Sequence, residues 1–273
     1  MDDRRARRPD SGSGGRAAKP TIEKKRLDVL LVEQGFFSSR ERAQASVMAG
    51  VVRVNGVREW KAGVRHGSDA RIEVTEDALK YVSRGGLKLE KALREWRIDL
   101  NGRTAADIGA STGGFTDLML RSGAARVYAI DVGYGQLDWK LRTDPRVTNI
   151  ERTNIRYMDR ALIAGPLDFI AIDVSFISLR LVLPVAVSLL APDGGVVALI
   201  KPQFEAERGQ VGKKGVVRDV AVRAETVDKV KGYAADNGLV TEGVVESPIT
   251  GAKGNVEFLA YLKRADRCMF EVK

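Results

Sequence analysis

The stretch Asp107-Ile108-Gly109-Ala110-Ser111-Thr112-Gly113-Gly114 decides the fold of this chain. It begins at the end of a run at 105–108 that predicts a buried strand, and it opens a segment with helical periodicity. Glycines let the backbone turn sharply at this point and come close to a ligand. The sequence therefore predicts a strand, a tight glycine-rich loop and a helix, which is the ligand-binding turn of an α/β sheet.

The spacing of the glycines indicates which ligand such a loop binds. The loop lacks the G-x-G-x-x-G pattern of dinucleotide-binding folds and the lysine of a P-loop. The form D-x-G-x-x-x-G instead suits the amine and carboxylate of an amino acid, as in adenosylmethionine. Glycine-rich turns are common in α/β folds, but here Asp131 follows the next predicted strand, where a carboxylate can hold ribose hydroxyls. The expected cofactor-binding residues are Asp107, Gly109, Ala110, Ser111, Gly113, Gly114, Phe115 and Asp131.

Apolar runs alternate with amphipathic segments from about residue 83 onwards, which predicts a parallel α/β sheet. The predicted strands are 105–108, 127–130, 147–151, 169–173 and 196–200, with helices between them, and a longer helix is expected over 219–237. A short loop joins the last two predicted strands, 243–246 and 256–262, so they should pair antiparallel. A parallel sheet that ends in an antiparallel hairpin is more typical of an adenosylmethionine-dependent methyltransferase than of a nicotinamide dehydrogenase.

A smaller α/β module is expected at residues 22–80, before the larger domain at 83–273. Helical periodicity covers 26–35, and a second helix should begin at Ser38, with Glu41 completing a capping box. A short strand, the Asn55-Gly56 turn and a strand at 71–74 follow. Residues 1–21 are basic and rich in Ser and Gly, so we expect a disordered tail, either an arm that touches RNA or a solvated leader.

Charge and composition narrow the classes of function. Lys and Arg number 45 against 36 Asp and Glu, which leaves a net charge of +9 and points to nucleic acid first and an anionic membrane second. One histidine, His66, and one cysteine, Cys268, argue against a disulfide scaffold and against a metal centre built from Cys or His ligands, so no metal is expected. No stretch is long enough to span a bilayer and the N-terminus lacks a signal-peptide core, so we expect a cytoplasmic protein without membrane contact.

Two charged residues stand at the ends of predicted strands. Asp173 ends one strand and Lys201 ends the next, so both should lie at the carboxyl edge of the sheet, where ligands bind. A partly buried lysine beside a carboxylate can act as a base or can position a hydroxyl. The alternative is a structural ion pair, which spacing alone does not exclude.

Several stretches of the chain resemble known families. Residues 24–60 resemble the S4 RNA-binding domain, through the Lys-Lys-Arg-Leu-Asp-Val-Leu-Leu, Ser-Arg-Glu-Arg-Ala and Val-Arg-Val-Asn-Gly stretches. Residues 81–262 resemble the FtsJ-type RNA 2′-O-methyltransferases, through the motifs at 81–86, 109–116, 131–137, 173–178 and 201–205. The combination is similar to the TlyA family, which modifies ribosomal RNA and has also been called a haemolysin. The resemblance implies a Rossmann-like class I methyltransferase preceded by an RNA-binding domain.

The resemblance also implies a tetrad of Lys, Asp, Lys and Glu, which falls on Lys88, Asp173, Lys201 and Glu257. It implies adenosylmethionine as cofactor and 2′-O-methylation of cytidine in 16S ribosomal RNA, 23S ribosomal RNA or both, free or within subunits, with no obligate protein partner. The chain departs from FtsJ in two places. Asn154 stands where an acid usually lies near adenine, and the Asp173 motif reads Asp-Val-Ser-Phe in place of Asp-Met-Ala-Pro, so we expect a different shape on the substrate side.

Basic residues outside the tetrad are expected to grip RNA phosphates. The candidates are Arg26, Arg40, Arg42 and Arg53 in the N-terminal module, and Lys213 and Lys214 in a glycine-rich stretch at 204–216 that we expect to be a flexible loop. Some of these, Arg42 first, could instead form surface ion pairs one helical turn apart. The competing functions are a non-catalytic RNA-binding or ribosome-assembly factor, a nucleotide-dependent oxidoreductase, and a membrane-lysing haemolysin, for which the sequence has no amphipathic membrane helix.

Overall fold

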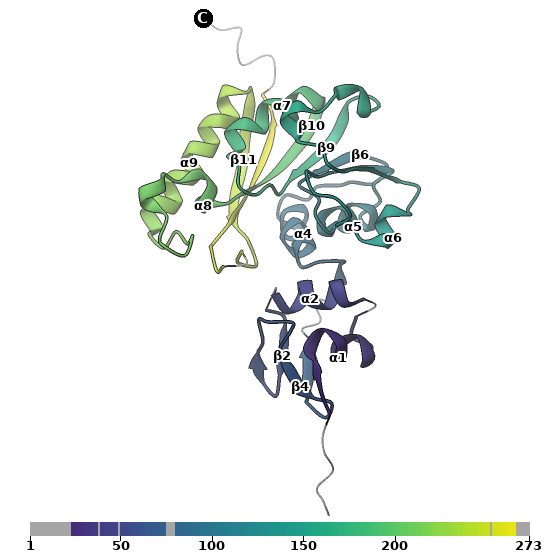
Figure 1. The fold of residues 1–273 in the computed structure, drawn as a ribbon. Coiled ribbons are helices and arrows are strands. Elements are labelled where there is room, and N and C mark those ends of the chain that lie inside the picture. The colour runs from purple at the N-terminus through teal and green to yellow at the C-terminus, as the bar shows by residue number, and fades with distance from the viewer. Residues whose placement is uncertain (1–22, 38, 49, 75–79, 252, 266–273) are drawn as a thin grey trace, which may run out of the picture.

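The computed structural model describes residues 23–37, 39–48, 50–74, 80–251 and 253–265, which form two bodies (Figure 1). The smaller body comes from the N-terminal part of the chain and the larger body from residue 80 onwards. The tail expected at 1–21 lies outside the described residues.

Among the described residues, the smaller body packs two helices against short strands. Its elements are β1 (Lys24–Arg26), α1 (Leu27–Glu33), α2 (Arg40–Met48), β2 (Val52–Val54), β3 (Val57–Arg58), β4 (Arg65–Gly67) and β5 (Ile72–Val74). Strands β3, β2 and β5 form one sheet in that order, while β1 pairs with β4. Leu27, Leu30 and Val47 lie in its core with at most 1 % of their surface exposed. The sequence predicted both helices and the Asn55-Gly56 turn, whose two residues have positive φ.

Helix α2 begins with a different cap from the one predicted. The hydroxyl oxygen of Ser39 accepts a hydrogen bond from the backbone N–H of Arg42 at 3.3 Å, which satisfies one of the first free N–H groups of the helix. Ser38, the predicted cap, lies outside the described residues.

The larger body is built on a sheet of seven strands. Its principal elements are α4 (Gly85–Glu95), β6 (Thr104–Ile108), α5 (Gly114–Arg121), β7 (Arg126–Ile130), α6 (Trp139–Arg142), β8 (Val147–Ile150), β9 (Leu167–Ile172), α7 (Leu183–Leu189), β10 (Leu190–Ile200), α8 (Pro202–Glu205), α9 (Val220–Asp236), β11 (Leu239–Glu246) and β12 (Phe258–Arg264). Four short 3₁₀ turns lie between them: η1 (Ile155–Tyr157), η2 (Arg160–Leu162), η3 (Leu179–Leu181) and η4 (Arg208–Gln210). The strand order is β11-β12-β10-β9-β6-β7-β8.

The pairing of the strands confirms the predicted fold class. Strands β8, β7, β6, β9 and β10 are parallel neighbours, while β12 runs antiparallel to both β10 and β11. The chain order reverses between β6 and β9, and ligands bind at such a switch point beyond the carboxyl ends of the strands. Strand β10 begins at Leu190, six residues earlier than predicted, and its register shifts between Leu190 and Gly195.

Helices cover both faces of this sheet, because successive side chains of a strand point to opposite sides. Ala106 and Ile108 of β6 pack with α7 and α9, whereas Ala105 packs with α4, α5 and α6. Figure 1 shows α4, α5 and α6 together on one side of the sheet, the side that lies toward the smaller body. The two apolar layers fix the strand ends, and therefore the loops that follow them.

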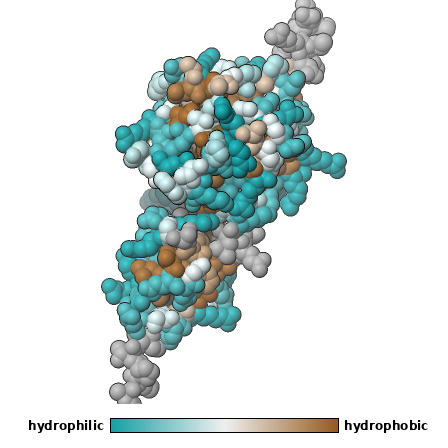
Figure 2. All heavy atoms as spheres, turned by 90° about the vertical axis from the view of Figure 1, so that its right-hand side faces the viewer, coloured by the Kyte–Doolittle hydropathy of each residue, from teal (hydrophilic) through white to brown (hydrophobic). Residues whose placement is uncertain are grey.

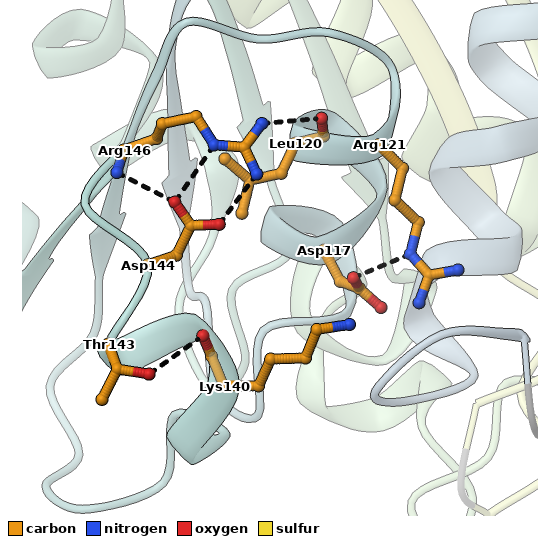
Figure 3. A network of polar contacts seen from close by, with 7 residues as sticks. All are labelled: Asp117, Leu120, Arg121, Lys140, Thr143, Asp144 and Arg146. Atoms are coloured by element: carbon orange, nitrogen blue, oxygen red, sulfur yellow. Dashed lines mark hydrogen bonds and ion pairs between the residues drawn. The ribbon is translucent and has the colours of Figure 1, made fainter.

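Ion pairs and hydrogen bonds connect α5 to the segments packed beside it (Figure 3). Arg146 pairs with Asp144 at 2.8 Å and donates to the carbonyl of Leu120 at 3.3 Å, which joins the end of α5 to the turn before β8. Asp117 of α5 accepts from Arg121 at 2.9 Å and from the N–H of Val82 at 3.0 Å. The segment that enters α4 is thereby attached to α5.

The exposed surface is mostly hydrophilic in the view of Figure 2, with small hydrophobic patches on both bodies. No helix among the described residues is long and apolar enough to cross a membrane.

Candidate active site

The glycine-rich loop connects β6 to α5 through a backbone that needs glycine at two points. Gly109 has φ +90°, and a Cβ there would lie 2.5 Å from the backbone oxygen of Asp173. Gly113 has φ +94° and packs against Leu137 and Leu141. Ser111 also has positive φ, at 48°. The loop is therefore held tightly against the end of β9, and its backbone stays open toward the neighbouring pocket.

Asp107 lies beneath this loop at the end of β6 and is 1 % exposed. One carboxyl oxygen accepts from the backbone N–H and the hydroxyl of Thr116, at 2.9 and 2.7 Å. The other oxygen is buried without a hydrogen-bond partner. Burial raises the pKa of Asp107 to about 7, although the bonds from Thr116 oppose that shift. An unpaired acceptor thus lies at the wall of the pocket.

Asp131 lies directly after β7 and holds the loop from the other side. Its two carboxyl oxygens accept from the backbone N–H of Ser111 at 2.8 Å and from that of Gly133 at 2.6 Å. A carboxylate has about four acceptor positions, so capacity for further donors remains. Asn154, in contrast, is exposed and its side-chain oxygen accepts from the N–H of Arg156, which caps η1.

The four residues of the implied tetrad lie close together. Nζ of Lys201, after β10, is 2.5 Å from Oδ1 of Asp173, after β9. Nζ of Lys88, on α4, is 2.7 Å from Oε2 of Glu257 and 3.8 Å from Oδ2 of Asp173. Lys88, Lys201 and Glu257 are buried, with at most 9 % of each residue exposed. Four separate parts of the fold thus bring two positive and two negative charges together.

The positive charges of the two lysines offset the cost of burying the Asp173 carboxylate. Burial alone would raise the pKa of Asp173, but Lys88 and Lys201 together hold it below its ordinary value. Arg84, at the start of α4, faces the same carboxylates: burial lowers the pKa of its guanidinium, and the charges of Glu257 and Asp173 oppose that effect. Asp173 therefore remains ionised, and it can keep a neighbouring ammonium group in place.

A pocket of about 650 Å³ joins the loop to the tetrad. Asp107, Gly109, Ala110, Ser111, Gly114 and Phe115 line one part of it, and all four tetrad residues line another. Ser46, Met48 and Val51 of the smaller body line its rim. Gly113, Asp131 and Asn154 are not part of the lining, although Asp131 supports the loop from behind.

The segment at 173–178 carries residues that the sequence did not single out. The hydroxyl of Ser175 lies 2.9 Å from Nζ of Lys201. Phe176 has φ +65° and is 92 % exposed, with its ring centroid 5.1 Å from that of Phe204. Such strain in an exposed aromatic residue is typical of a functional position.

Glu205 anchors the same segment. The hydroxyl of Ser178 donates to its carboxylate at 2.6 Å and the N–H of Leu179 donates at 2.8 Å. Burial raises the pKa of Glu205, although these two bonds oppose the shift. Nothing in the spacing of Lys201-Pro202-Gln203-Phe204-Glu205 reveals this contact, because its partner is 26 residues away.

The stretch expected to be a flexible loop is shorter and better anchored than predicted. Helix α8 and turn η4 take up part of it. Asn255, which is 2 % exposed, accepts from the N–H of Val217 at 2.9 Å and donates to the carbonyl of Gly215 at 2.8 Å. Lys213 and Lys214 are exposed on the turn that this amide holds.

The basic residues of the smaller body have varied surroundings. Arg26 and Arg40 both pair with the buried carboxylate of Asp28, at 3.0 and 3.1 Å. Arg42 donates to the carbonyl of Tyr81 at 3.4 Å, so it links the two bodies in place of the surface ion pair considered above. Arg53 donates to the carbonyl of Gly56 at 3.1 Å. Contacts of these residues with RNA remain predictions.

Two family models match the chain. The FtsJ-like methyltransferase model matches residues 81–264, and the S4 domain model matches residues 25–64. Among curated proteins, the chain is 51% identical over 243 residues to the putative rRNA methyltransferase YqxC of Bacillus subtilis, covering 89% of this chain and 86% of that protein. It is 44% identical over 246 residues to the 16S/23S rRNA (cytidine-2′-O)-methyltransferase TlyA of Mycobacterium tuberculosis, covering 89% of this chain and 92% of that protein.

A solved structure also resembles the whole chain. The putative hemolysin from Streptococcus thermophilus superimposes with a TM-score of 0.72 and 47% sequence identity, over 90% of each chain. A putative S-adenosylmethionine-dependent methyltransferase from Listeria monocytogenes, at 16% identity and a TM-score of 0.51, shares the fold of the larger body.

Proposed function

The chain belongs to the FtsJ-like methyltransferase family, and we propose that it transfers a methyl group from adenosylmethionine to the ribose 2′-hydroxyl of cytidine in ribosomal RNA. The observation that carries the proposal is the contact of Lys201 with Asp173 beside the glycine-rich loop, with Lys88 and Glu257 paired behind it. The cytidine and the ribosomal RNA come from what the Mycobacterium tuberculosis relative is named for.

The residues at the loop fit adenosylmethionine. Gly109, Ala110 and Ser111 line the pocket, where an amino-acid group can approach them, and the unpaired oxygen of Asp107 can accept from its ammonium. The free acceptor positions of Asp131 suit ribose hydroxyls. When bound, adenosylmethionine supplies a methyl group activated by its sulfonium. The same proposal places Asn154 beside the adenine of the cofactor, where its side-chain amide can form a hydrogen bond.

The tetrad residues act on the 2′-hydroxyl. As an ammonium group, Lys201 donates a hydrogen bond that holds the 2′-oxygen where it must face the methyl group. As a neutral amine, Lys201 takes the proton of the 2′-hydroxyl at the same place. Asp173 holds Lys201 by an ion pair. Lys88 lies 3.8 Å from Asp173, and Glu257 balances its charge at 2.7 Å, so this pair fixes the position of Asp173 from the other side.

RNA would be held on both bodies. The S4 domain contributes Arg26, Arg40, Arg42 and Arg53, and the larger body contributes Lys213 and Lys214 near the pocket. Phe176 is exposed at the pocket and suits stacking against an unpaired base. A ribose in a duplex must be made accessible before it reaches the tetrad, and an exposed ring there can stabilise the displaced base.

The test is methyl transfer from labelled adenosylmethionine to purified ribosomal subunits and to naked ribosomal RNA, followed by nuclease mapping of the label. A 2′-O-methylcytidine at a defined position supports the proposal. The matched control is Lys201→Ala, which should bind adenosylhomocysteine but transfer no methyl group. Cofactor binding without incorporation into any RNA would favour a non-catalytic RNA-binding or ribosome-assembly factor.

A further inference from the structure

We propose that Ser175 is a positioning residue that fixes the direction of the Lys201 ammonium toward the ribose hydroxyl, an inference that rests on the function proposed above. Ser175 Oγ lies 2.9 Å from Nζ of Lys201, on the segment that follows β9. Its side chain lines the same pocket as the tetrad. Ser175 is not one of the four charged residues that the family pattern implies.

The number of hydrogen-bond donors on Lys201 explains how Ser175 orients its ammonium group. An ammonium group has three N–H donors and no acceptor, so the Ser175 oxygen accepts. Within the described part of the chain, Asp173 Oδ1 at 2.5 Å and Ser175 Oγ at 2.9 Å are the acceptors that Nζ contacts. Two acceptors fix a tetrahedral nitrogen, and its third N–H then points in one direction. With one acceptor alone, the nitrogen could swing on its flexible four-carbon stem.

The position of Ser175 does not depend on Lys201. The N–H of Asp173 donates to the carbonyl of Ile108 at 2.9 Å, which holds one end of the segment. Ser178 and Leu179 donate to Glu205 and hold the other end. The hydroxyl is therefore placed by the backbone of a short segment anchored at both ends, as a positioning residue requires.

The same hydroxyl gives a physical meaning to the sequence of this segment. Ser175 is the third residue of the Asp173-Val174-Ser175-Phe176 stretch, and it places an acceptor beside Lys201. Asp173 still pairs with Lys201 when the Ser175 hydroxyl is removed, so the expected loss is partial. It should reside in the methyl-transfer step, because the Ser175 bond orients the nitrogen and contributes nothing to the glycine-rich loop.

The kinetic test compares Ser175→Ala, Ser175→Thr and the control Ser188→Ala, an exposed serine on α7. Single-turnover methyl transfer should fall about 10- to 100-fold in Ser175→Ala, because small misplacements of a reacting group cost that much. The KM for RNA and the affinity for adenosylhomocysteine should stay at the parental values. Ser175→Thr keeps the hydroxyl and should recover most of the rate. Parental turnover in Ser175→Ala, or equal losses in the Ala and Thr variants, would overturn the proposal.

A second measurement needs no substrate. Crystal structures of the parent protein and of Ser175→Ala should differ in the position of Lys201 Nζ, which turns about its contact with Asp173 only in the variant. An unchanged Nζ in Ser175→Ala would overturn the positioning role. If the parent itself methylates no RNA, the proposed function fails, and this structural comparison still decides whether Ser175 positions Lys201.

Discussion

Lys88 on α4 and Glu257 before β12 are 169 residues apart in sequence, yet their Nζ and Oε2 atoms lie 2.7 Å apart. Both side chains are buried, and Lys88 also lies 3.8 Å from Asp173. The pair therefore joins the helix before the sheet to the hairpin that completes it, at the position where the tetrad assembles. Replacing both residues by apolar side chains should therefore separate the two roles of the pair, in the stability of the fold and in methyl transfer.

Removing one member of this pair should destabilise the fold, because the partner is left as an uncompensated buried charge. We expect Glu257→Ala to lose about 3–5 kcal/mol of unfolding free energy in urea titrations. The double variant Lys88→Met with Glu257→Met should recover much of that stability, since apolar side chains replace both charges. It should remain inactive in methyl transfer. A double variant as unstable as the single one would show that the ion pair is not the cause.

Asp131→Ala should weaken the binding of adenosylmethionine and adenosylhomocysteine. The carboxylate holds Ser111 and Gly133 by their N–H groups and keeps acceptor positions for a ribose. Isothermal titration calorimetry measures the change directly, and affinity for RNA alone should not change. Asp159→Ala is the matched control, because that carboxylate caps η2 by accepting from Ala161. Equal cofactor affinity in Asp131→Ala and the parent would remove Asp131 from the site.

Lys213 and Lys214 should contribute to RNA affinity mainly through phosphates. Both are exposed on the turn that Asn255 holds near the pocket. The double alanine variant should bind RNA more weakly, and its slope of log affinity against log salt should decrease by roughly one to two. Lys231→Ala, on α9 beside Asp228, serves as the control. An unchanged slope in the double variant would mean that these lysines do not touch phosphate.

Asp107 should make the stability of the protein fall as pH rises from about 4 to about 7. Burial raises the pKa of Asp107 from 3.8 to about 7, so the folded state binds a proton that the unfolded state has released. The stabilisation is complete below the unfolded pKa and is lost as pH rises through the folded pKa. In the parent, the free energy of unfolding should fall between pH 5 and pH 8, and Asp107→Asn should make that fall smaller by a few kcal/mol, measured by urea unfolding at both pH values. Parallel stability curves for variant and parent would contradict the shift.

Local patterns predicted the strands of the larger body and the place of Asp173 and Lys201, because both follow apolar strands that must end at the same edge. Lys88 and Glu257 could not be found in this way. One lies on a helix and the other precedes a hairpin strand, and only the resemblance to FtsJ-type enzymes indicated them.

The remaining contacts depend on three-dimensional proximity that spacing does not encode. Strands β1 and β4 were not predicted, because Lys24–Arg26 and Arg65–Gly67 are short, charged and lack apolar alternation. The same limit applies to Ser175 and Asn255, whose partners lie 26 to 40 residues away. The ion pairs of Arg26 and Arg40 with the single carboxylate of Asp28 were also not predicted, although they bear on how strongly the two arginines attract phosphate.

The most direct test of the central claim uses two RNAs that differ in one atom. One contains the mapped target cytidine and the other contains 2′-deoxycytidine at that position. If Lys201 and Asp173 act on the ribose 2′-oxygen, the first RNA accepts labelled methyl groups and the second accepts none, while both bind equally. Equal incorporation into both RNAs would place the methyl group on another atom and contradict the account.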